Sequence, residues 1–165
     1  MLFRSGRQEV ARTLIAMPHP YPAGAAQEWI AKHDGLWRSG DELLLAITDR
    51  ASGEFLGAFV LKFDAPHRHA EAGYWLRDDR WGQGIATEAP RACVAWGFDA
   101  FGLHRIVARH MAANPASGAV MRKAGLVHEG VLREHFWKDG VAHDFHVYGI
   151  LRSDYLARRG APASS

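Results

Sequence analysis

The chain has 165 residues, of which 48% are hydrophobic and 23% are charged, and its net charge is +2. This length and composition favour one globular domain and exclude a disordered chain, which would need more charge and fewer apolar residues. A single cysteine excludes an intramolecular disulfide, and the lack of a lysine or arginine run and of a long apolar stretch argues against nucleic-acid and membrane partners.

The first half of the chain predicts two helices followed by three strands. Apolar residues at helical spacing predict a helix over Gln8 to Met17 and a second one from about Ala25 to Arg38. Two apolar segments, Leu43 to Thr48 and Phe55 to Phe63, flank a Ser-Gly turn and predict a β-hairpin. The segment from Ala70 to Leu76 predicts the third strand.

The second half predicts helices that alternate with strands. A glycine-rich turn leads into an apolar helix on which Ile85 and Ala100 mark the ends of a regularly spaced stripe, and Arg105 to Met111 predicts the next strand. A short helix follows, which Ser117 can cap and which Gly125 can end in a left-handed conformation. The last two strands, Val127 to Lys138 and Val141 to Leu151, flank Asp139-Gly140, a strong hairpin signal.

This element order predicts a mixed α/β sheet with strand–helix–strand crossovers in its second half. We expect one domain over residues 1–158 and a flexible tail over 159–165, because the end of the chain is low in complexity. We also expect the aromatic residues Trp29, Trp37, Trp96 and Phe98 to belong to stripes that pack into the core.

The turn around Gly82 and Gly84 has two interpretations. A strand that leads through Gly-x-Gly into a helix places unpaired backbone N–H groups at the positive end of the helix dipole, where a phosphate binds well. The same glycines also fit a plain structural turn. The sequence has neither the Gly-Lys-Ser/Thr ending of a nucleotide P-loop nor the third glycine of a dinucleotide fingerprint.

Several short segments around this turn occur in a particular order and spacing. They are Glu71–Leu76, Trp81–Ala89, Phe101–Ile106, Asn114–Ser117, Lys123–Leu126, and Lys138–Gly140 followed by Asp144. Together they resemble the GNAT superfamily of N-acetyltransferases, most closely its RimJ/RimL-like branch of ribosomal-protein N-terminal acetyltransferases. The resemblance implies a mostly antiparallel sheet with a central parallel pair flanked by helices. It also implies transfer of an acetyl group from acetyl-CoA, without a metal, to a primary amine of a protein N-terminus or a small molecule.

The resemblance also implies which residues bind acetyl-CoA. Backbone N–H groups of the turn would hold its pyrophosphate. The strand that precedes the turn would pair with the pantetheine arm, and its Leu76 N–H would polarise the thioester carbonyl. An asparagine side chain would hold the arm from the neighbouring strand. In this sequence the turn residues are Gln83, Gly84, Ile85, Ala86 and Thr87, the strand residues are Trp75, Leu76 and Arg77, and the asparagine is Asn114.

Acyl transfer to an amine requires a base for the ammonium and a proton for the leaving thiolate. Glu71 matches the family's candidate base, acting through a water; its alternative role is an edge-strand carboxylate paired with an arginine. Ser117 is the candidate proton donor, although it also suits a helix N-cap. Many relatives place a tyrosine acid where this chain has Met121, which has no proton to give. Pro90, early in the phosphate-binding helix, predicts a kink or a loosened first turn.

Other features support less specific interpretations. The ten histidines include the pairs His67/His69 and His143/His146, but no partner set completes a recognisable metal site, so we expect no metal. Cys93 suits a small buried hydrophobe. Phe136 and Trp137 could line the acceptor pocket or pack at the sheet edge.

Two alternatives to an acetyltransferase remain on sequence grounds. One is a non-catalytic acyl-CoA-binding or regulatory module on the same fold, and the other is a metal-dependent hydrolase. The start of the chain lacks a signal-peptide pattern, which predicts a cytoplasmic location, and a homodimer is the default expectation. Compared with the family, about twenty residues are absent before Gln8, so we expect a short or missing first strand or a true start codon further upstream.

Overall fold

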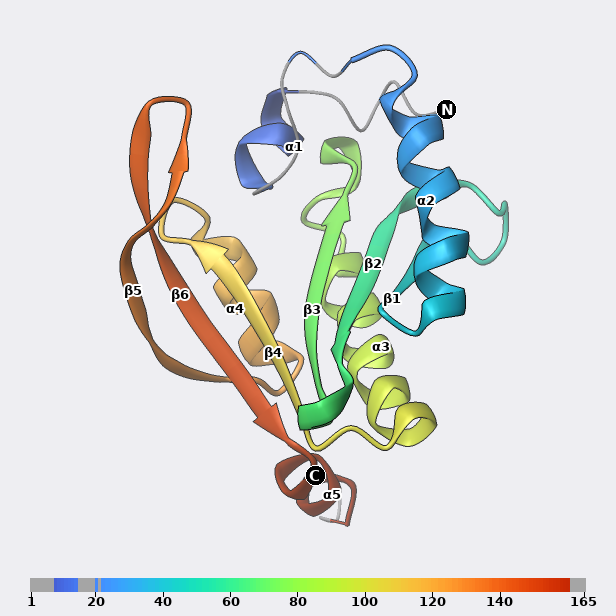
Figure 1. Cartoon of the computed structure of the whole chain (residues 1–165), viewed down its shortest axis with the longest axis vertical. Coiled ribbons are helices and arrows are strands. Elements are labelled where there is room, and N and C mark those ends of the chain that lie inside the picture. The colour runs from blue at the N-terminus through green and yellow to red at the C-terminus, as the bar shows by residue number, and fades with distance from the viewer. Residues whose placement is uncertain (1–7, 15–19, 21, 161–165) are drawn as a thin grey trace.

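The computed structural model describes residues 8–14, 20 and 22–160, and these contain one six-stranded sheet with the strand order β1-β2-β3-β4-β6-β5 (Figure 1). Its strands are β1 (Glu42–Thr48), β2 (Phe55–Asp64), β3 (His69–Leu76), β4 (Arg105–Met111), β5 (Val127–Lys138) and β6 (Val141–Leu151). Only β3 and β4 run parallel, and the other neighbours are antiparallel. The predicted mixed sheet with a central parallel pair is confirmed.

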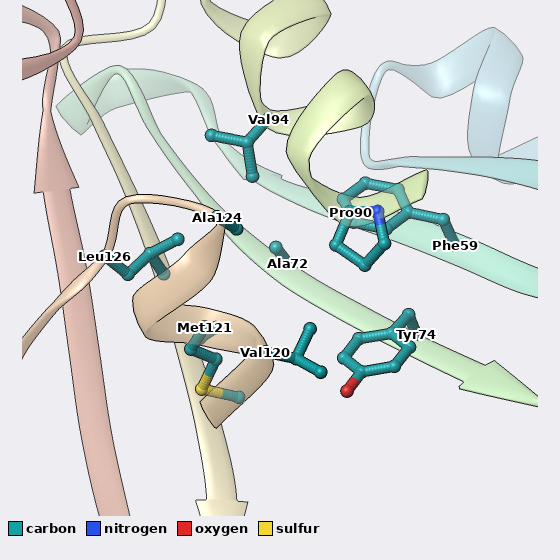
Figure 2. A pocket seen from close by; sticks show the side chains of 10 residues that line it. Phe59, Ala72, Tyr74, Pro90, Val94, Val120, Met121, Ala124 and Leu126 are labelled. Carbon is teal, nitrogen blue, oxygen red and sulfur yellow. The ribbon is translucent and has the colours of Figure 1, made fainter. Parts of the chain in front are cut away.

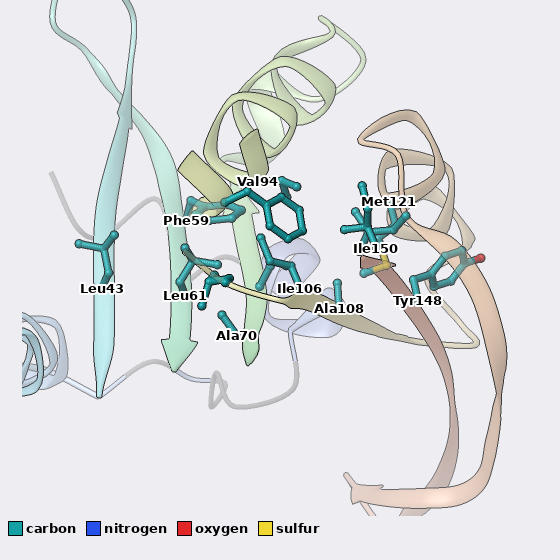
Figure 3. Packing of buried hydrophobic residues seen from close by; sticks show 14 of the residues in the cluster. Leu43, Phe59, Leu61, Ala70, Val94, Ile106, Ala108, Met121, Tyr148 and Ile150 are labelled. Carbon is teal, nitrogen blue, oxygen red and sulfur yellow. The ribbon is translucent and has the colours of Figure 1, made fainter. Parts of the chain in front are cut away.

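Helices cover both faces of this sheet. They are α1 (Gln8–Thr13), α2 (Ala25–Ser39), α3 (Ile85–Phe101), α4 (Pro115–Lys123) and α5 (Arg152–Gly160), with short 3-10 turns η2 (Ala65–His67) and η3 (Asp78–Arg80). Helices α3 and α4 lie on one face, whereas α1 and α2 lie on the other (Figures 1 and 3). The sequence did not predict α5, which extends two residues into the expected tail; residues 161–165 lie outside the described ranges.

The start of the chain bears on two predictions. Helix α1 ends at Thr13, four residues before the predicted end at Met17, and residues 15–17 lie outside the described ranges. The expectation of a short or missing first strand concerns residues 1–7, which also lie outside them. In the described part of the chain the first strand is β1.

The parallel pair is short, and this opens the sheet at its centre. Strands β3 and β4 are paired only from His69/Arg105 to Ala72/Ala108. Beyond this point β3 continues to pair with β2, and β4 continues to pair with β6. The facing edges of the two strands therefore diverge (Figure 1), and their backbone groups there pair with no strand of the described chain.

The core fills the space between the sheet and α3. Phe59, Leu61 and Ile106 are almost completely buried there (Figure 3). Phe98 of α3 is completely buried as well. On α3 the buried side consists of Pro90, Val94, Gly97 and Phe98, so the predicted stripe from Ile85 to Ala100 lies about one residue off the buried face.

The prediction that the tryptophans belong to the core is wrong for Trp29, Trp37 and Trp96, which are 37%, 49% and 43% exposed, and correct for Phe98. Helix α2 packs near the outer strand β1, where only one side of a helix is covered, and Ala26 is its buried residue. Trp37 and Trp96 instead pack edge-on against Phe101.

Both predicted hairpins are present. The turn between β5 and β6 has Asp139 at φ 51° and Gly140 at φ 78°, the pair of positive dihedrals that a two-residue hairpin turn requires. Gly125 ends α4 at φ 99°, as predicted from its left-handed preference.

Candidate active site

The glycine turn joins β3 to α3 at the open end of the gap. Gly82 and Gly84 have φ values of 75° and 82°, and a Cβ at either position would meet no other atom within 4 Å. Glycine is therefore required for its backbone conformation and not for space. The indole N–H of Trp81 donates to the Leu76 carbonyl at 3.1 Å and ties the turn to the end of β3.

The turn presents unused donors at the N-terminus of α3. Gly84 is the N-cap, and no side chain caps the helix. Thr87 N–H donates to the Gly84 carbonyl at 2.8 Å, so this predicted phosphate donor is engaged. In the described chain the N–H groups of Gln83, Ile85 and Ala86, and that of Gly84 itself, donate to no protein group, which leaves them for an anion.

Pro90 does not loosen the first turn of α3. Thr87 and Glu88 both donate to the Gly84 carbonyl, at 2.8 and 3.1 Å, and the helix continues through Pro90 as one element. The proline removes only its own donor, which would have bonded to Ala86, so the turn that would hold an anion stays closed.

The end of β3 turns one backbone donor into the gap. Arg77 N–H donates to the Leu56 carbonyl on β2 at 2.9 Å, and successive peptide groups of a strand point to opposite edges. The Leu76 N–H therefore faces the gap between β3 and β4. This agrees with the position that an N–H needs in order to reach a thioester carbonyl lying between the strands.

The side chain of Arg77 is fully engaged by protein groups. It is 5% exposed and pairs with Asp79 and Glu54, at 2.6 Å to each, and these two carboxylates raise its pKa. Its N–H and carbonyl are also hydrogen-bonded, to Leu56 and Arg80. Arg77 thus holds the end of β3 against β2 and η3, whereas the resemblance implies a contact with the pantetheine arm.

Helix α4 begins on the other side of the gap. Asn114 is its N-cap, and its side-chain oxygen accepts from the Ser117 N–H at 3.3 Å. The prediction that Ser117 caps this helix is therefore wrong, because the cap lies three residues earlier and Ser117 occupies the third helical position. The Ser117 side chain instead lies near the hydroxyl of Tyr74 on β3, where it lowers the pKa of that phenol against the larger, opposite effect of burial.

A small apolar cavity lies between α3, α4 and the diverging strands (Figure 2). Its volume is about 20 Å³, and Tyr74, Pro90, Val94, Val120 and Met121 are among its lining residues. Among the described residues that line it, Tyr74 alone carries a hydroxyl, and burial raises the pKa of this phenol. The sequence reasoning missed Tyr74, although it shares a strand face with Ala72 and Leu76.

Glu71 lies at the apex of the gap on the opposite face of the sheet. Arg109 of β4 donates to both of its carboxylate oxygens, from Nε at 3.1 Å and from Nη2 at 2.6 Å. Glu71 is thus paired with an arginine, which is one of the two roles that the sequence suggests for it. The strand that carries it, β3, is however a central strand and not an edge strand. The pairing does not exclude a role in proton transfer, because each carboxylate oxygen keeps a further lone pair.

A bulge in β5 brings a histidine to the same place. Leu132 pairs with Phe145 and Phe136 pairs with His143, so residues 133–135 lie opposite a single residue of β6. That residue, Asp144, accepts a hydrogen bond from the Glu134 N–H at 2.7 Å, and Glu134 has a φ of 48°. The bulge places His135 Nε2 3.4 Å from Nη1 of Arg109.

The tip of the β5–β6 hairpin contacts α1. Lys138 donates through Nζ to the carbonyl oxygens of Ala11 and Leu14, at 2.6 Å to each, and Val10 and Ala11 are buried. Of the two aromatic residues beside the turn, Phe136 stacks on Phe145, and Trp137 is 71% exposed. Segments more than a hundred residues apart thus close one end of the site.

The histidines fall into small groups. His146 lies between His110 and His128. Its ring centroid is 5.1 Å from that of His110 and 5.2 Å from that of His128, and its Nδ1 lies 3.1 Å from His128 Nε2. His67 and His69 have ring centroids 6.1 Å apart. Within the described ranges, no group of three or more His, Cys, Asp or Glu side chains is placed so that it could hold a metal ion.

Two further findings concern Cys93 and the helices. Cys93 is half-buried in α3, and burial raises the pKa of its thiol, as for a small packed hydrophobe. In the part of the chain that the structure describes, no helix combines the length and apolarity needed to span a membrane.

Comparison with known proteins gives concordant results. Residues 1–127 match the sequence profile of the family described as "Acetyltransferase (GNAT) domain". The chain is 40% identical over 86 residues to "Uncharacterized N-acetyltransferase YoaA" of Bacillus subtilis, which covers 52% of this chain and 49% of that protein. It is 32% identical over 104 residues to "Putative ribosomal N-acetyltransferase YdaF" of the same organism, covering 62% of this chain and 57% of that one. The chain thus spans about half the length of these curated relatives.

Solved structures extend the similarity over most of the chain. The spermidine N-acetyltransferase of Vibrio cholerae, in complex with CoA and spermine, is similar with a TM-score of 0.74 and 25% identity, covering 85% of this chain and 82% of that one. A ribosomal-protein-S5-alanine acetyltransferase from Vibrio fischeri shares the fold with a TM-score of 0.79 and 23% identity, covering 93% and 85%. By its profile match, its sheet and its glycine turn, the chain belongs to the GNAT acetyltransferase domain family.

Proposed function

We propose that the protein transfers an acetyl group from acetyl-CoA to a primary amine by direct attack of the amine on the thioester. The observation that carries this proposal is the gap between β3 and β4, with the glycine turn at its mouth and the Leu76 N–H directed into it. An extended pantetheine arm fits between two strands whose facing edges are unpaired, as an added strand would. The relatives' names as N-acetyltransferases support the same reaction.

In this proposal the cofactor contacts come mainly from the backbone. The N–H groups of Gln83, Gly84, Ile85 and Ala86 would hold the pyrophosphate, helped by the dipole of α3. Trp75 and Leu76 would pair with the pantetheine arm, and the Leu76 N–H would stabilise the oxyanion of the tetrahedral intermediate. Asn114 would hold the arm from the start of α4. Arg77 would act only indirectly, by holding the end of β3 in place.

The two proton transfers would occur on opposite faces of the sheet. Glu71, held by Arg109, would accept a proton from the acceptor ammonium through a water, so that the neutral amine attacks the carbonyl carbon. When the tetrahedral intermediate collapses, the C–S bond breaks, and Ser117 would give its proton to the departing thiolate. No enzyme nucleophile and no metal takes part in these steps.

The acceptor is a primary amine, either a protein N-terminus or a small molecule. Names among the relatives and neighbours include ribosomal-protein and spermidine acetyltransferases, which span these two classes. Placement in the RimJ/RimL-like branch, a cytoplasmic location and a homodimer belong to this proposal, and the named ribosomal acetyltransferases support the first of them.

A non-catalytic acyl-CoA-binding module is the second candidate. It is favoured by the two hydrogen bonds from Arg109 that occupy the Glu71 carboxylate, and by Met121 in place of a tyrosine acid. In that case the same gap would bind the cofactor without turnover.

One experiment separates the two candidates. The protein is incubated with acetyl-CoA and an array of peptides with free N-termini, polyamines and other small amines, and thiol release is followed. Release with at least one amine supports the acetyltransferase, whereas thermal stabilisation by CoA without release on any amine supports the binding module. Stabilisation by zinc but not by CoA would contradict both.

A further inference from the structure

We propose that Tyr74 positions the Ser117 hydroxyl and supplies a proton to it, so that the two hydroxyls form one relay to the departing thiolate. The inference rests on the proposed acetyl transfer and adds a strand residue to Ser117, the proton donor that the sequence suggests. It is carried by the placement of Tyr74 beyond the last β3–β4 pair, in a cavity that Val120 and Met121 of α4 also line.

The geometry brings the two hydroxyl groups to one point. Ser117, Val120 and Met121 are three and four residues apart on α4 and so share one face of that helix. Val120 and Met121 line the cavity that the Tyr74 ring enters from β3, and the hydroxyl end of the ring is directed toward α4 (Figure 2). This arrangement places the Ser117 side chain near the Tyr74 phenol, close enough to lower the pKa of that phenol.

The surroundings suit a group that holds its proton until it is needed. Phe59, Pro90 and Val94 surround the ring with apolar side chains, and burial raises the pKa of the phenol, so that it stays protonated at neutral pH. A serine hydroxyl is a poor acid by itself, because an isolated alkoxide is unstable. A phenol that donates as serine gives up its proton lowers that cost, because a phenolate is a much weaker base than a serine alkoxide.

The proton balance is simple. As the C–S bond breaks, its electron pair goes to sulfur, the Ser117 proton moves to the thiolate, and the Tyr74 proton moves to the serine oxygen. The phenolate that remains on Tyr74 takes a proton from solvent before the next turnover. Met121, one helical turn beyond Ser117, lines the same cavity as Tyr74 and has no proton to give.

Kinetics of Tyr74→Phe, Ser117→Ala and the double variant test the relay. We expect Tyr74→Phe to lower kcat about 10- to 100-fold and to leave the KM for acetyl-CoA within about threefold of wild type. Because the two groups act as one unit, the kcat of the double variant should lie within about threefold of the kcat of Ser117→Ala. Tyr155→Phe is the matched control, since its hydroxyl bonds to Asp99 at 2.9 Å, outside the gap, and it should leave kcat unchanged.

A second measurement does not depend on turnover. The affinities of CoA and desulfo-CoA, which lacks the sulfur, are compared by calorimetry at alkaline pH, where the thiolate forms. The wild-type protein should bind CoA about tenfold more tightly than desulfo-CoA, which corresponds to one hydrogen bond to a charged group. Tyr74→Phe should reduce this ratio several-fold, whereas Tyr155→Phe should leave it unchanged.

The outcomes distinguish this inference from the proposed function. If the wild-type protein binds CoA but acetylates no amine, the proposed function fails and the CoA/desulfo-CoA ratio still decides the role of Tyr74. A ratio that Tyr74→Phe leaves unchanged contradicts the relay, even if kcat falls, because the variant would then act through packing. Additive losses in the double variant would also contradict it.

Discussion

Glu71 and Arg109 illustrate how a single contact supports two roles. Arg109 holds both carboxylate oxygens and contacts His135, so it connects β3, β4 and the β5 bulge at the apex of the gap. Such a half-exposed ion pair contributes little to the free energy of unfolding, about 0–1 kcal/mol. Its larger effect is to fix the direction of the carboxylate, which a proton acceptor at this position requires.

The carboxylate of Glu71 can therefore be tested apart from the fold. We expect Glu71→Gln to lower kcat at least about tenfold, because an amide cannot accept the ammonium proton, and to leave CoA binding unchanged. Steady-state kinetics and calorimetry with CoA provide the two values. Glu129→Gln is the control, since it also breaks an arginine–carboxylate pair of β4, with Arg105, outside the gap. Equal kcat values for Glu71→Gln and wild type would remove Glu71 from the mechanism.

At the scale of elements, α3 depends on its glycine N-cap. Gly84 has φ 82° and ψ −15°, and Gly24, the N-cap of α2, has nearly the same conformation at φ 84° and ψ −20°. A Cβ at either glycine meets no atom within 4 Å, so alanine at both positions costs only backbone strain, about 1–2 kcal/mol. The N-cap glycines of α3 and α2 thus have the same backbone geometry, but only the N-terminus of α3 is proposed to bind an anion.

This pair gives a matched test of the phosphate-binding turn. We expect Gly84→Ala and Gly24→Ala to lower the free energy of unfolding by similar amounts, but only Gly84→Ala to weaken CoA binding, by about tenfold. A turn that relaxes to relieve the strain of alanine at positive φ no longer directs its N–H groups at the pyrophosphate. Denaturant titration and calorimetry measure the two effects. Equal CoA affinities for both variants would show that the turn serves the fold alone.

At the scale of the whole molecule, the sequence predicts the features that are determined by residues adjacent along the chain. The strand segments, the Asp139-Gly140 hairpin and the left-handed Gly125 follow from local periodicity and turn chemistry. Long-range packing decided the rest. The cap at Asn114 in place of Ser117, the exposure of Trp37 and the engagement of Arg77 depend on what lies across the sheet, which periodicity does not show.

The candidate site was predictable to a similar extent. The turn residues and Leu76 could be assigned by resemblance, because their function uses backbone groups at fixed positions along the chain. Tyr74 and Arg109 could not, since their roles arise only where β3 and β4 diverge. The contact of Lys138 with α1 is likewise invisible in the sequence, because it joins residues more than 120 positions apart.

The histidine group on the α4 side of the sheet makes the stability of the whole domain depend on pH. His110 is 7% exposed, its Nδ1 donates to the Met111 carbonyl at 2.8 Å, and its Nε2 has no partner among the described residues. Burial lowers its pKa, and the neighbouring His146, His128 and Arg122 act in the same direction. Its neutral form is thus the one that fits the folded state.

The sign of the effect follows from proton linkage. Below the ordinary histidine pKa of about 6.5, the unfolded chain binds a proton at His110 that the folded chain does not, so stability is lost as the pH falls from there toward the lowered pKa, by up to about 1.4 kcal/mol per pH unit. We expect His110→Phe, which keeps a ring against His146, to reduce the difference in unfolding free energy between pH 7.5 and pH 5.5. Denaturant titrations at the two pH values measure it, with His104→Phe, an exposed position, as the control. If both variants keep the wild-type difference, the acid sensitivity arises elsewhere and the burial of His110 does not control it.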